Sequence, residues 1–411
     1  MLAERGGAEN KPASGSGKAK NIIYMMGDGM GQAQRDAIQL ATVGAYGRLE
    51  MDKLPYEGMV GTNSVDPETF VTDSAAGATS PATGVKTYNG AIGVDENGEP
   101  VTTIIERAKA AGKSVGLVTT SQVTDASPAG FAAHVEDRSQ QSEIARQYIE
   151  DTRVDVILGG GEDWWYPEGE EGAFPDNPPE DPEEQSQGTE GNLVDRAQEL
   201  GYEYVTDQEA LQSADGRKVL GLFANEEMFQ QRPEGQGALY DPTVPLPVMT
   251  RKAIELLSRD PQGFFLFVEE EAIDEMSHQN NAPLTIKSGQ ALDEAVALSE
   301  RYTDNHKRTL LIATADHECG GLTIEGLDDP EFPDESGGNE GDPNANLSIE
   351  DGPFPVANSD YEFIMDWTTT GHTAGDVPLT AKGPGARLLT GNYENTEIYD
   401  VMAKTLGVAR R

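Results

Sequence analysis

The chain has 411 residues, and 30 Lys and Arg stand against 72 Asp and Glu, which gives a formal net charge of −42 and a pI of about 4.3. This length is enough for one large α/β domain or two smaller ones. The charge excludes a nucleic-acid or anionic-membrane binder, because either partner would be repelled. The longest apolar runs are much shorter than the roughly 20 residues of a membrane span, and the single Cys319 excludes an intramolecular disulfide framework.

Residues 1–20 are small and polar and lack the apolar stretch of a signal peptide. We expect a flexible N-terminal segment at 1–20 and a single domain over 21–411. The chain is then either cytoplasmic or a mature or recombinant form whose signal has been removed.

Short apolar runs that end in polar, glycine-rich or acidic residues predict buried parallel strands. They are residues 21–26, 114–120, 154–160, 263–269 and 309–315. Helical patterns lie between them, at 101–112, 142–151, 246–260 and 286–305. This alternation predicts an α/β fold with a doubly wound, mostly parallel central sheet and helices on both faces. In such a sheet, ligands bind beyond the carboxyl ends of the strands.

Two segments are strongly acidic. Residues 162–190 hold eleven acids, five prolines and no Lys or Arg, and residues 325–351 hold ten acids within a longer stretch that has no basic residue. Both predict acidic surface insertions, near 162–190 and 322–369, rather than core elements. A surface adapted to high salt is the favoured interpretation, because salt screens self-repulsion, and it predicts a halophilic or halotolerant source. Calcium binding or an acidic partner tail is the alternative, although no loop has the EF-hand spacing.

The first motif follows the strand at 21–26. Asp28 lies in 27–31, a glycine-rich turn that lacks the G-x-G-x-x-G spacing, and its carboxylate would repel a pyrophosphate unless a cation lay between them. Asp28 is therefore either a metal ligand or a plain turn residue. Ser74 opens a small-residue stretch compatible with a helix, whose N-terminus favours anions, while an ordinary N-cap by Asp73 or Ser74 is the structural alternative. No G-x-S-x-G elbow is present, so a metal would have to activate this serine.

The second motif, 125–138, follows the strand at 114–120. Ser127 and Pro128 predict a helix start with Ser127 at the N-cap, which places Arg138 about three turns further along that helix. Arg138 is then either a site residue or part of a surface salt bridge.

Carboxylates and imidazoles follow the later strands. Asp274 and His278 are four residues apart and share a face of a helix, as a zinc site requires, and His372 lies in a glycine-bounded loop. Four of the five histidines lie in motif segments, which favours metal binding over histidines satisfied in the core. The predicted set is Glu269, Asp274, His278, Asp316, His317 and His372.

With these motifs the chain resembles the bacterial alkaline phosphatases, from about Asn21 to about Gly407. The matching segments are 21–31, 72–95, 124–138, 268–278, 314–321 and 370–376. The resemblance implies a single catalytic domain that hydrolyses phosphate monoesters through a phosphoserine intermediate, with a broad substrate range and an alkaline optimum.

The resemblance also implies two Zn²⁺ and one Mg²⁺ per chain. Their ligands would be Asp274, His278 and His372 for the first zinc, Asp28, Asp316 and His317 for the second, and Asp28, Glu269 and Ser127 for magnesium. Ser74 would be the nucleophile, and Arg138 would bind two phosphate oxygens with its planar fork.

Three acids near these ligands complete the predicted site. Asp73 precedes the nucleophile, and Asp125 lies behind the magnesium ligands, where family members carry Asp or His. Glu275 is a departure, because many members carry Lys, His or Trp there. It should weaken phosphate binding, or it turns outward without effect.

The expected partners are small phosphomonoester substrates and inorganic phosphate, with no membrane and no nucleic acid. A homodimer and a periplasmic or secreted location follow from the resemblance alone. A phosphodiesterase of the same superfamily is the enzymatic alternative, although it usually has Thr as nucleophile. A sulfatase would need a C/S-x-P-x-R signature that Ser74 lacks. A non-catalytic, acidic, ion-binding surface protein is the alternative from another class.

Overall fold

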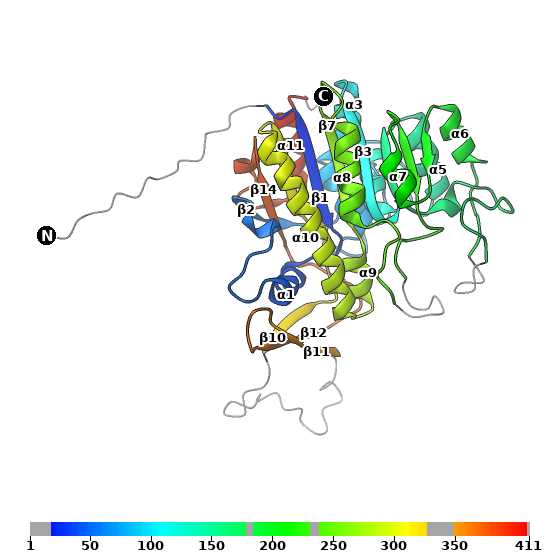
Figure 1. Ribbon diagram of the computed structural model, residues 1–411. Coiled ribbons are helices and arrows are strands. Elements are labelled where there is room, and N and C mark those ends of the chain that lie inside the picture. The colour runs from blue at the N-terminus through cyan, green and yellow to red at the C-terminus, as the bar shows by residue number, and fades with distance from the viewer. Residues whose placement is uncertain (1–17, 178–183, 231–237, 327–348, 409–411) are drawn as a thin grey trace, which may run out of the picture.

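A ten-stranded, mostly parallel sheet forms the centre of the molecule in the computed structural model, which describes residues 18–177, 184–230, 238–326 and 349–408 (Figure 1). In spatial order the strands are β15 (Gly391–Glu394), β2 (Tyr56–Gly61), β14 (Val377–Lys382), β8 (Thr309–Thr314), β1 (Asn21–Gly27), β7 (Phe264–Glu270), β3 (Ser114–Gln122), β4 (Val156–Gly160), β6 (Val219–Leu222) and β5 (Glu203–Val205). Only β14 runs antiparallel to its neighbours. The doubly wound α/β prediction is confirmed.

The five predicted strands are β1, β3, β4, β7 and β8. Every residue of β1, β4, β7 and β8 is buried, which explains why their sequences are apolar on both faces. β2 was not predicted, because its residues 56–61 are mostly half-exposed and include two glycines.

Helices cover both faces of the sheet. One group packs together around α10 and consists of α1 (Gln32–Thr42), α8 (Leu246–Leu257), α9 (Ala272–His278) and α10 (Ala282–Asn305). In Figure 1, α8 and α10 lie in front of the sheet. A second group consists of α2 (Ser74–Thr83), α3 (Ile104–Ala110), α4 (Ala126–Ala132), α5 (Gln141–Glu150) and α11 (Asn395–Leu406). The shorter α6 (Leu193–Glu199) packs against the edge strand β5, and α7 (Gln208–Ser213) packs against α8.

N-cap residues explain why two predicted helix starts differ from those in the structure. The helix predicted at 101–112 begins at Ile104, because the side chain of Thr103 accepts a hydrogen bond from the backbone N–H of Glu106. The helix predicted at 286–305 begins earlier, at Ala282, because the side chain of Asn281 caps it.

The prediction for the helix after β3 was wrong in two respects. Asp125, and not Ser127, is the N-cap residue of α4, and the helix ends at Ala132. Arg138 therefore lies beyond the helix, in a turn. The chain leaves the helix because Val135 pairs with Ile92 and the backbone N–H of Arg138 donates to the carbonyl of Gly90.

The expectation that 322–369 contains no core elements was also wrong. β10 (Leu322–Gly326), β11 (Ile349–Pro355) and β12 (Glu362–Trp367) form a three-stranded sheet, and residues 327–348 lie outside the described residues. On β12 the alternate residues Phe363, Met365 and Trp367 are buried in a small second core. This period of two is the signal of a strand with one buried face.

The other acidic segment is only partly a surface feature. Within 162–190, Glu162, Asp163 and Trp165 are buried, and residues 178–183 lie outside the described part. Of the predicted flexible segment at 1–20, residues 1–17 also lie outside it. Among the described residues no helix is long and apolar enough to cross a membrane.

Candidate active site

The predicted site residues converge at the carboxyl ends of the central strands β8, β1, β7 and β3, which are neighbours in the sheet. Asp28 follows β1, and Asp316 and His317 follow β8. Glu269 lies within β7 and Arg138 in the turn beyond α4. The other predicted residues come from α9, α2, the start of α4 and a two-stranded ribbon in which β13 (His372–Thr373) pairs with β9 (Glu318–Cys319). His372 thus lies in a short strand and not in a loop as predicted.

One group of side chains, here the Asp274 cluster, consists of Asp274, His278, His372 and Cys319. Asp274 Oδ2 lies 3.0 Å from His278 Nε2 and 3.5 Å from His372 Nε2, and the two Nε2 atoms are 3.1 Å apart. A tetrahedral ion with bonds of about 2.0–2.1 Å holds its ligand atoms about 3.3 Å apart. The spacing of these three atoms therefore fits a zinc ion.

The hydrogen bonds on the far side of both imidazoles support this interpretation. His278 Nδ1 lies 2.6 Å from the carbonyl oxygen of Thr370, and His372 Nδ1 lies 2.9 Å from that of Thr72. A carbonyl only accepts, so both Nδ1 atoms carry protons. In the neutral rings both Nε2 atoms then carry a lone pair and no proton, and they face each other and a carboxylate. A cation or added protons must offset the repulsion among these three acceptors.

Without a metal, this cluster behaves as an internal ion pair. Burial alone would raise the pKa of Asp274, but the imidazoles of His278 and His372 hold it well below its usual range. Burial would lower the pKa of His278, but the Asp274 carboxylate raises it to about 9. The pKa of His372 is raised for the same reason.

The second group, here the Asp28 cluster, consists of Asp28, Ser74, Ser127, Glu269, Asp316 and His317. His317 Nε2 lies 3.2 Å from Ser74 Oγ, 3.2 Å from Asp316 Oδ2 and 3.5 Å from Asp28 Oδ1. Its ring stacks on that of His372 at 3.6 Å, so the two clusters are adjacent. One nitrogen and several oxygens therefore converge beside a serine hydroxyl.

A purely oxygen-lined part of the Asp28 cluster lies towards β3. Ser127 Oγ donates to Asp28 Oδ2 at 3.1 Å, and Thr119 Oγ1 donates to Glu269 Oε2 at 2.6 Å. The buried atoms Asp28 Oδ1, Glu269 Oε1 and Asp316 Oδ2 accept no hydrogen bond from any residue that the structure describes. Hydroxyl and carboxylate oxygens are the ligands that magnesium prefers, so this part fits a magnesium ion.

Burial and mutual repulsion dominate the titration of the Asp28 cluster. Burial, followed by the charge of Asp316, raises the pKa of Asp28 well above its usual range. Burial raises the pKa of Asp316 to about 7 and that of Glu269 to about 8. Burial and the neighbouring His372 lower the pKa of His317. These carboxylates cannot all be ionised at neutral pH unless cations lie among them.

Ser74 is the first residue of α2. Asp73 caps this helix by accepting a hydrogen bond from the backbone N–H of Ala76 at 3.0 Å. Ser74 therefore lies at the positive end of the helix, and its Oγ faces His317. Gly29 makes this close packing possible, since it has a φ of +63° and a Cβ there would lie 2.3 Å from Asp274 Oδ1.

Arg138 reaches the edge of the site from its turn. Its guanidinium lies 2.7 Å from Asp125 Oδ1 and 3.6 Å from Asp73 Oδ2, with about a third of the side chain (35%) exposed. Burial would lower its pKa, but Asp125 and Asp73 raise it. The arginine is thus a permanent cation, oriented by the two acids that flank the site.

Further acids lie beside the two clusters. Glu275 is half-buried, and burial and Asp274 raise its pKa to about 8, so it does not simply turn outward. Burial and Glu275 raise the pKa of Glu271 well above its usual range. Burial also raises the pKa of Glu227, which accepts from Gln122 Nε2 at 2.7 Å, to about 7.

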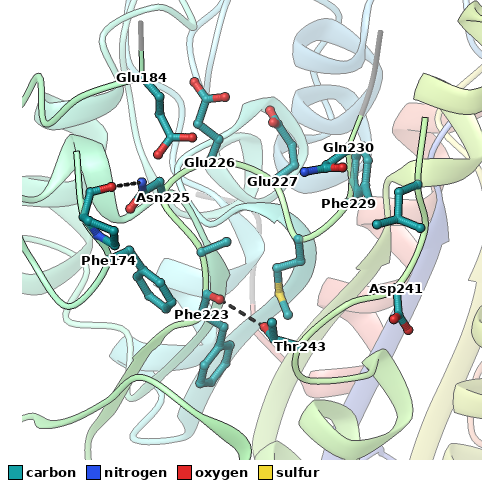
Figure 2. A pocket seen from close by; sticks show the side chains of 14 residues that line it. Phe174, Glu184, Phe223, Asn225, Glu226, Glu227, Phe229, Gln230, Asp241 and Thr243 are labelled. Carbon is teal, nitrogen blue, oxygen red and sulfur yellow. Dashed lines mark hydrogen bonds between the residues drawn. The ribbon is translucent and has the colours of Figure 1, made fainter. Parts of the chain in front are cut away.

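Glu227 also lines a cavity of about 310 Å³ next to β6 (Figure 2). In Figure 2 the carboxylates of Glu184, Glu226 and Glu227 lie along one side and the rings of Phe174 and Phe223 along another. None of the predicted site residues lines this cavity. Glu227 links this cavity to the site, because its charge acts on Glu271 and Glu275 and it is itself affected by the charge of Asp125.

Sequence reasoning did not single out Thr119 or Cys319, although both lie against predicted residues. Thr119 holds Glu269 from within β3, and Cys319 joins the Asp274 cluster. The position of Cys319 two residues after His317 was a usable signal, because a two-residue strand returns that side chain to the same region. The carbonyls that orient His278 and His372 are backbone groups, so the side-chain types in the sequence could not have revealed them.

Comparison with known proteins identifies the family. A family model described as alkaline phosphatase matches residues 19–350 and 355–408. Alkaline phosphatase 4 of Bacillus subtilis is 31% identical over 437 residues, covering 94% of this chain and 88% of that protein. The streptomycin-6-phosphate phosphatase of Streptomyces griseus is 33% identical and covers 96% and 92%, respectively. The crystal structure of Thermus thermophilus alkaline phosphatase has a TM-score of 0.77 at 25% identity and covers 100% of this chain and 97% of that chain.

These matches extend over nearly the whole chain and include every segment that contributes a side chain to the two clusters. The chain therefore belongs to the alkaline phosphatase family and is a phosphomonoester hydrolase of that family.

Proposed function

We propose that the chain hydrolyses phosphate monoesters through a phosphoserine at Ser74. Two zinc ions would be held by Asp274, His278 and His372 and by Asp28, Asp316 and His317, and a magnesium ion by Asp28, Glu269 and Ser127. The observation that carries the proposal is the position of Ser74 Oγ. It lies at a helix N-terminus and 3.2 Å from His317 Nε2, in a cluster whose buried carboxylate oxygens include some that accept no hydrogen bond from the described part of the chain.

The reaction then takes place in two steps at Ser74. Ser74 Oγ loses its proton and bonds to phosphorus while the ester P–O bond breaks, and the alcohol leaves with a proton. Water next breaks the Ser74 Oγ–P bond and releases inorganic phosphate. Two inversions give net retention at phosphorus. When bound, the zinc ions stabilise the attacking and leaving oxygens as Lewis acids, and magnesium offsets the charge of its carboxylate ligands.

Arg138 and α2 supply positive charge at fixed positions. The guanidinium fork matches two non-bridging phosphate oxygens, and Asp125 and Asp73 already orient it. The N-terminus of α2 points at the same group. Since phosphoryl transfer depends mainly on positioning and electrostatic stabilisation, these contacts select the phosphate and not the alcohol. The relatives include a streptomycin-6-phosphate phosphatase beside an alkaline phosphatase whose name specifies no alcohol, which supports a broad substrate range.

The proposal is tested with p-nitrophenyl phosphate. Turnover is expected with zinc and magnesium and should disappear with a chelator, whereas an ion-binding surface protein shows no turnover in either case. Bis(p-nitrophenyl) phosphate should be hydrolysed far more slowly, and a preference for this diester would favour the phosphodiesterase alternative.

The intermediate is tested by quenching the reaction in acid and counting labelled phosphate on the protein. Wild type should carry the label and Ser74→Ala should not, with a loss in kcat of at least about 1,000-fold. Ser80→Ala is the matched control, because Ser80 lies on the same helix and its hydroxyl donates to the carbonyl of Ala76. Label that persists in Ser74→Ala would refute the serine intermediate.

We also propose that the acidic surface is adapted to high salt. A net charge of −42 self-repels in dilute buffer, and molar salt shortens the Debye length to about 3 Å. The melting temperature should rise from dilute buffer to molar KCl, and an unchanged or falling value would contradict this. The homodimer and the compartment stay predictions from the resemblance, and sedimentation in molar KCl tests the first.

A further inference from the structure

The backbone of Arg138 lies in the turn beyond the end of α4, so the helix does not fix its position. Val135, in the same stretch, forms an antiparallel bridge with Ile92, and the backbone N–H of Arg138 donates to the carbonyl of Gly90 at 2.8 Å. The position of the arginine therefore depends on how firmly this stretch is held against residues 90–93.

Residues 90–93 also contact the helix that carries the nucleophile. The backbone N–H of Gly90 donates to Asp73 Oδ2 at 2.9 Å, and that of Gly93 donates to Thr79 Oγ1 at 3.0 Å. Asp73 is the N-cap residue of α2, and Thr79 lies within this helix, which begins at Ser74. Residues 90–93 thus connect the proposed nucleophile with the arginine.

His134 joins the stretch before Arg138 to two other parts of the molecule. Its Nδ1 lies 2.7 Å from the carbonyl oxygen of Gly93, and its Nε2 lies 3.1 Å from Glu106 Oε1 in the first turn of α3. A carbonyl oxygen and a carboxylate only accept, so both ring nitrogens donate and the ring is an imidazolium. Glu106 is itself held in place, because its Oε2 accepts the backbone N–H of Thr103 at 2.7 Å.

The titration of the pair agrees with this geometry. Burial would lower the pKa of His134, but Glu106, the carbonyl of Gly93 and, less strongly, Asp151 raise it. Burial would raise the pKa of Glu106, but His134 lowers it. The side chains of His134 and Glu106 are only 18% and 28% exposed, so solvent screens the ion pair weakly.

The backbone around His134 is fixed as well. The N–H of His134 donates to Gln147 Oε1 at 2.8 Å, and Gln147 Nε2 donates to the carbonyl of His134 at 3.0 Å. Gly93 has a φ of +61°, and a Cβ there would lie 2.1 Å from the carbonyl oxygen of Ala133, so a glycine is required for this close approach. The imidazole therefore has a defined place between α3 and residues 90–93.

We propose that His134 is a positioning residue for Arg138, which holds the turn of the arginine against residues 90–93 and α3 and so keeps the guanidinium where phosphate binds. The inference rests on the proposed function for the contact between Arg138 and phosphate. The guanidinium would bind phosphate oxygens in the bound substrate and in the transition state alike. Loosening the turn should therefore weaken phosphate binding more than it lowers kcat.

A double-mutant cycle on phosphate binding tests the proposal. The affinity of the metal-loaded protein for inorganic phosphate is measured at neutral pH by calorimetry, and kcat and KM are measured with p-nitrophenyl phosphate. His134→Ala should weaken phosphate binding about 10-fold and raise KM similarly, with kcat within about threefold of wild type and metal content unchanged. In the Arg138→Ala background the same substitution should have almost no effect, because no guanidinium is left to misplace.

The proposal is overturned if His134→Ala binds phosphate as wild type does, or if it causes the same loss in both backgrounds. If His134→Ala protein unfolds or loses its metals, His134→Asn replaces it in the cycle, because the amide keeps a donor near the position of Nδ1 and loses the contact with Glu106. His306→Ala is the matched control, since His306 is exposed at the end of α10 and its removal should leave phosphate affinity unchanged.

Failure of this inference can be distinguished from failure of the proposed function. Coupling between His134 and Arg138 in phosphate binding, without turnover, refutes the proposed function only. Equal losses in both backgrounds of an active enzyme refute the role of His134 only. Arg138→Ala protein that binds phosphate as tightly as wild type refutes the phosphate contact of the arginine, and the inference with it.

Discussion

The Asp274 cluster and the Asp28 cluster lie side by side but differ in how their buried charges are compensated. In the first, one carboxylate lies between two imidazoles, and the groups compensate one another once protons are taken up. In the second, three buried carboxylates share a single imidazole whose pKa is lowered. Metal-free protein therefore holds the first as an ion pair, whereas the second stays protonated until cations arrive.

Exposure separates the two clusters as well. The His278 side chain is 32% exposed, whereas those of Asp316 and His317 are 0% exposed. The Asp274 cluster is thus the side of the site open to solvent, where an alcohol can leave. The comparison indicates that cations at the Asp28 cluster matter more for stability, and that the Asp274 cluster faces the solvent side of the reaction.

The largest expected effect comes from Asp28, which contributes a ligand atom next to both Asp274 and His317. Asp28→Ala should lower kcat/KM by at least about 1,000-fold, because removing one ligand from a buried metal site disturbs the charge balance of both clusters. Metal content per chain and kcat/KM for p-nitrophenyl phosphate measure this.

Asp36→Asn is the control for Asp28→Ala, since Asp36 is an exposed residue of α1 and should leave both quantities unchanged. If the Asp28→Ala variant keeps its full metal content and near-normal turnover, Asp28 does not serve both clusters, and the comparison between the Asp274 cluster and the Asp28 cluster fails.

The pH dependence of stability distinguishes the clusters in metal-free protein. The folded-state pKa is raised from 3.8 to about 7 for Asp316 and from 4.5 to about 8 for Glu269. The folded state then binds more protons than the unfolded state, so stability is full below about pH 4 and is lost as pH rises through 7 and 8. The pKa of His278 is raised from 6.5 to about 9, so a further loss of stability is expected as the pH rises between these two values.

Urea unfolding of the metal-free chain between pH 4 and pH 9 measures this loss, which should reach several kcal/mol. Zinc and magnesium should flatten the profile, and Glu269→Gln should remove part of the loss below pH 8. A metal-free profile that is flat or rises with pH would contradict the account of the Asp28 cluster.

A moderate effect is expected at Glu275, which lies half-buried beside Asp274 on α9. Above pH 8, where Glu275 is ionised, Glu275→Lys replaces a negative charge near the proposed phosphate site by a positive one, so phosphate should bind several-fold more tightly and product release should slow. The inhibition constant of inorganic phosphate is the measurement. An inhibition constant equal to that of wild type would show that Glu275 does not act on the bound phosphate.

The smallest effect is expected at Ser127. Ser127→Thr keeps the hydroxyl that donates to Asp28, and magnesium accepts either hydroxyl oxygen, so kcat and magnesium content should stay within about twofold of wild type. Ser127→Ala removes the oxygen and should lower magnesium content. If the two variants behave alike, the hydroxyl is not part of the magnesium site.

Much of the fold could be predicted from local patterns. Each of the five predicted strands exists, because a strand buried on both faces needs a continuous apolar run, and that run is readable in one chain. The pairing of Asp274 with His278 was also readable, because residues four apart share a helix face. The path to Arg138 was not readable, since it depends on a bridge between Ile92 and Val135 that are distant in sequence.

By itself, then, the amino-acid sequence determined the alternation of strands and helices and the polar residues that end each strand, because these depend on side-chain type and short spacing. Only the tertiary structure decided which strand ends meet. The order β8, β1, β7, β3 brings Asp316, Asp28 and Glu269 to one edge of the sheet, and a two-residue strand brings Cys319 opposite His372. Such contacts join residues tens to hundreds of positions apart and arise from packing of the whole chain, which no local pattern encodes.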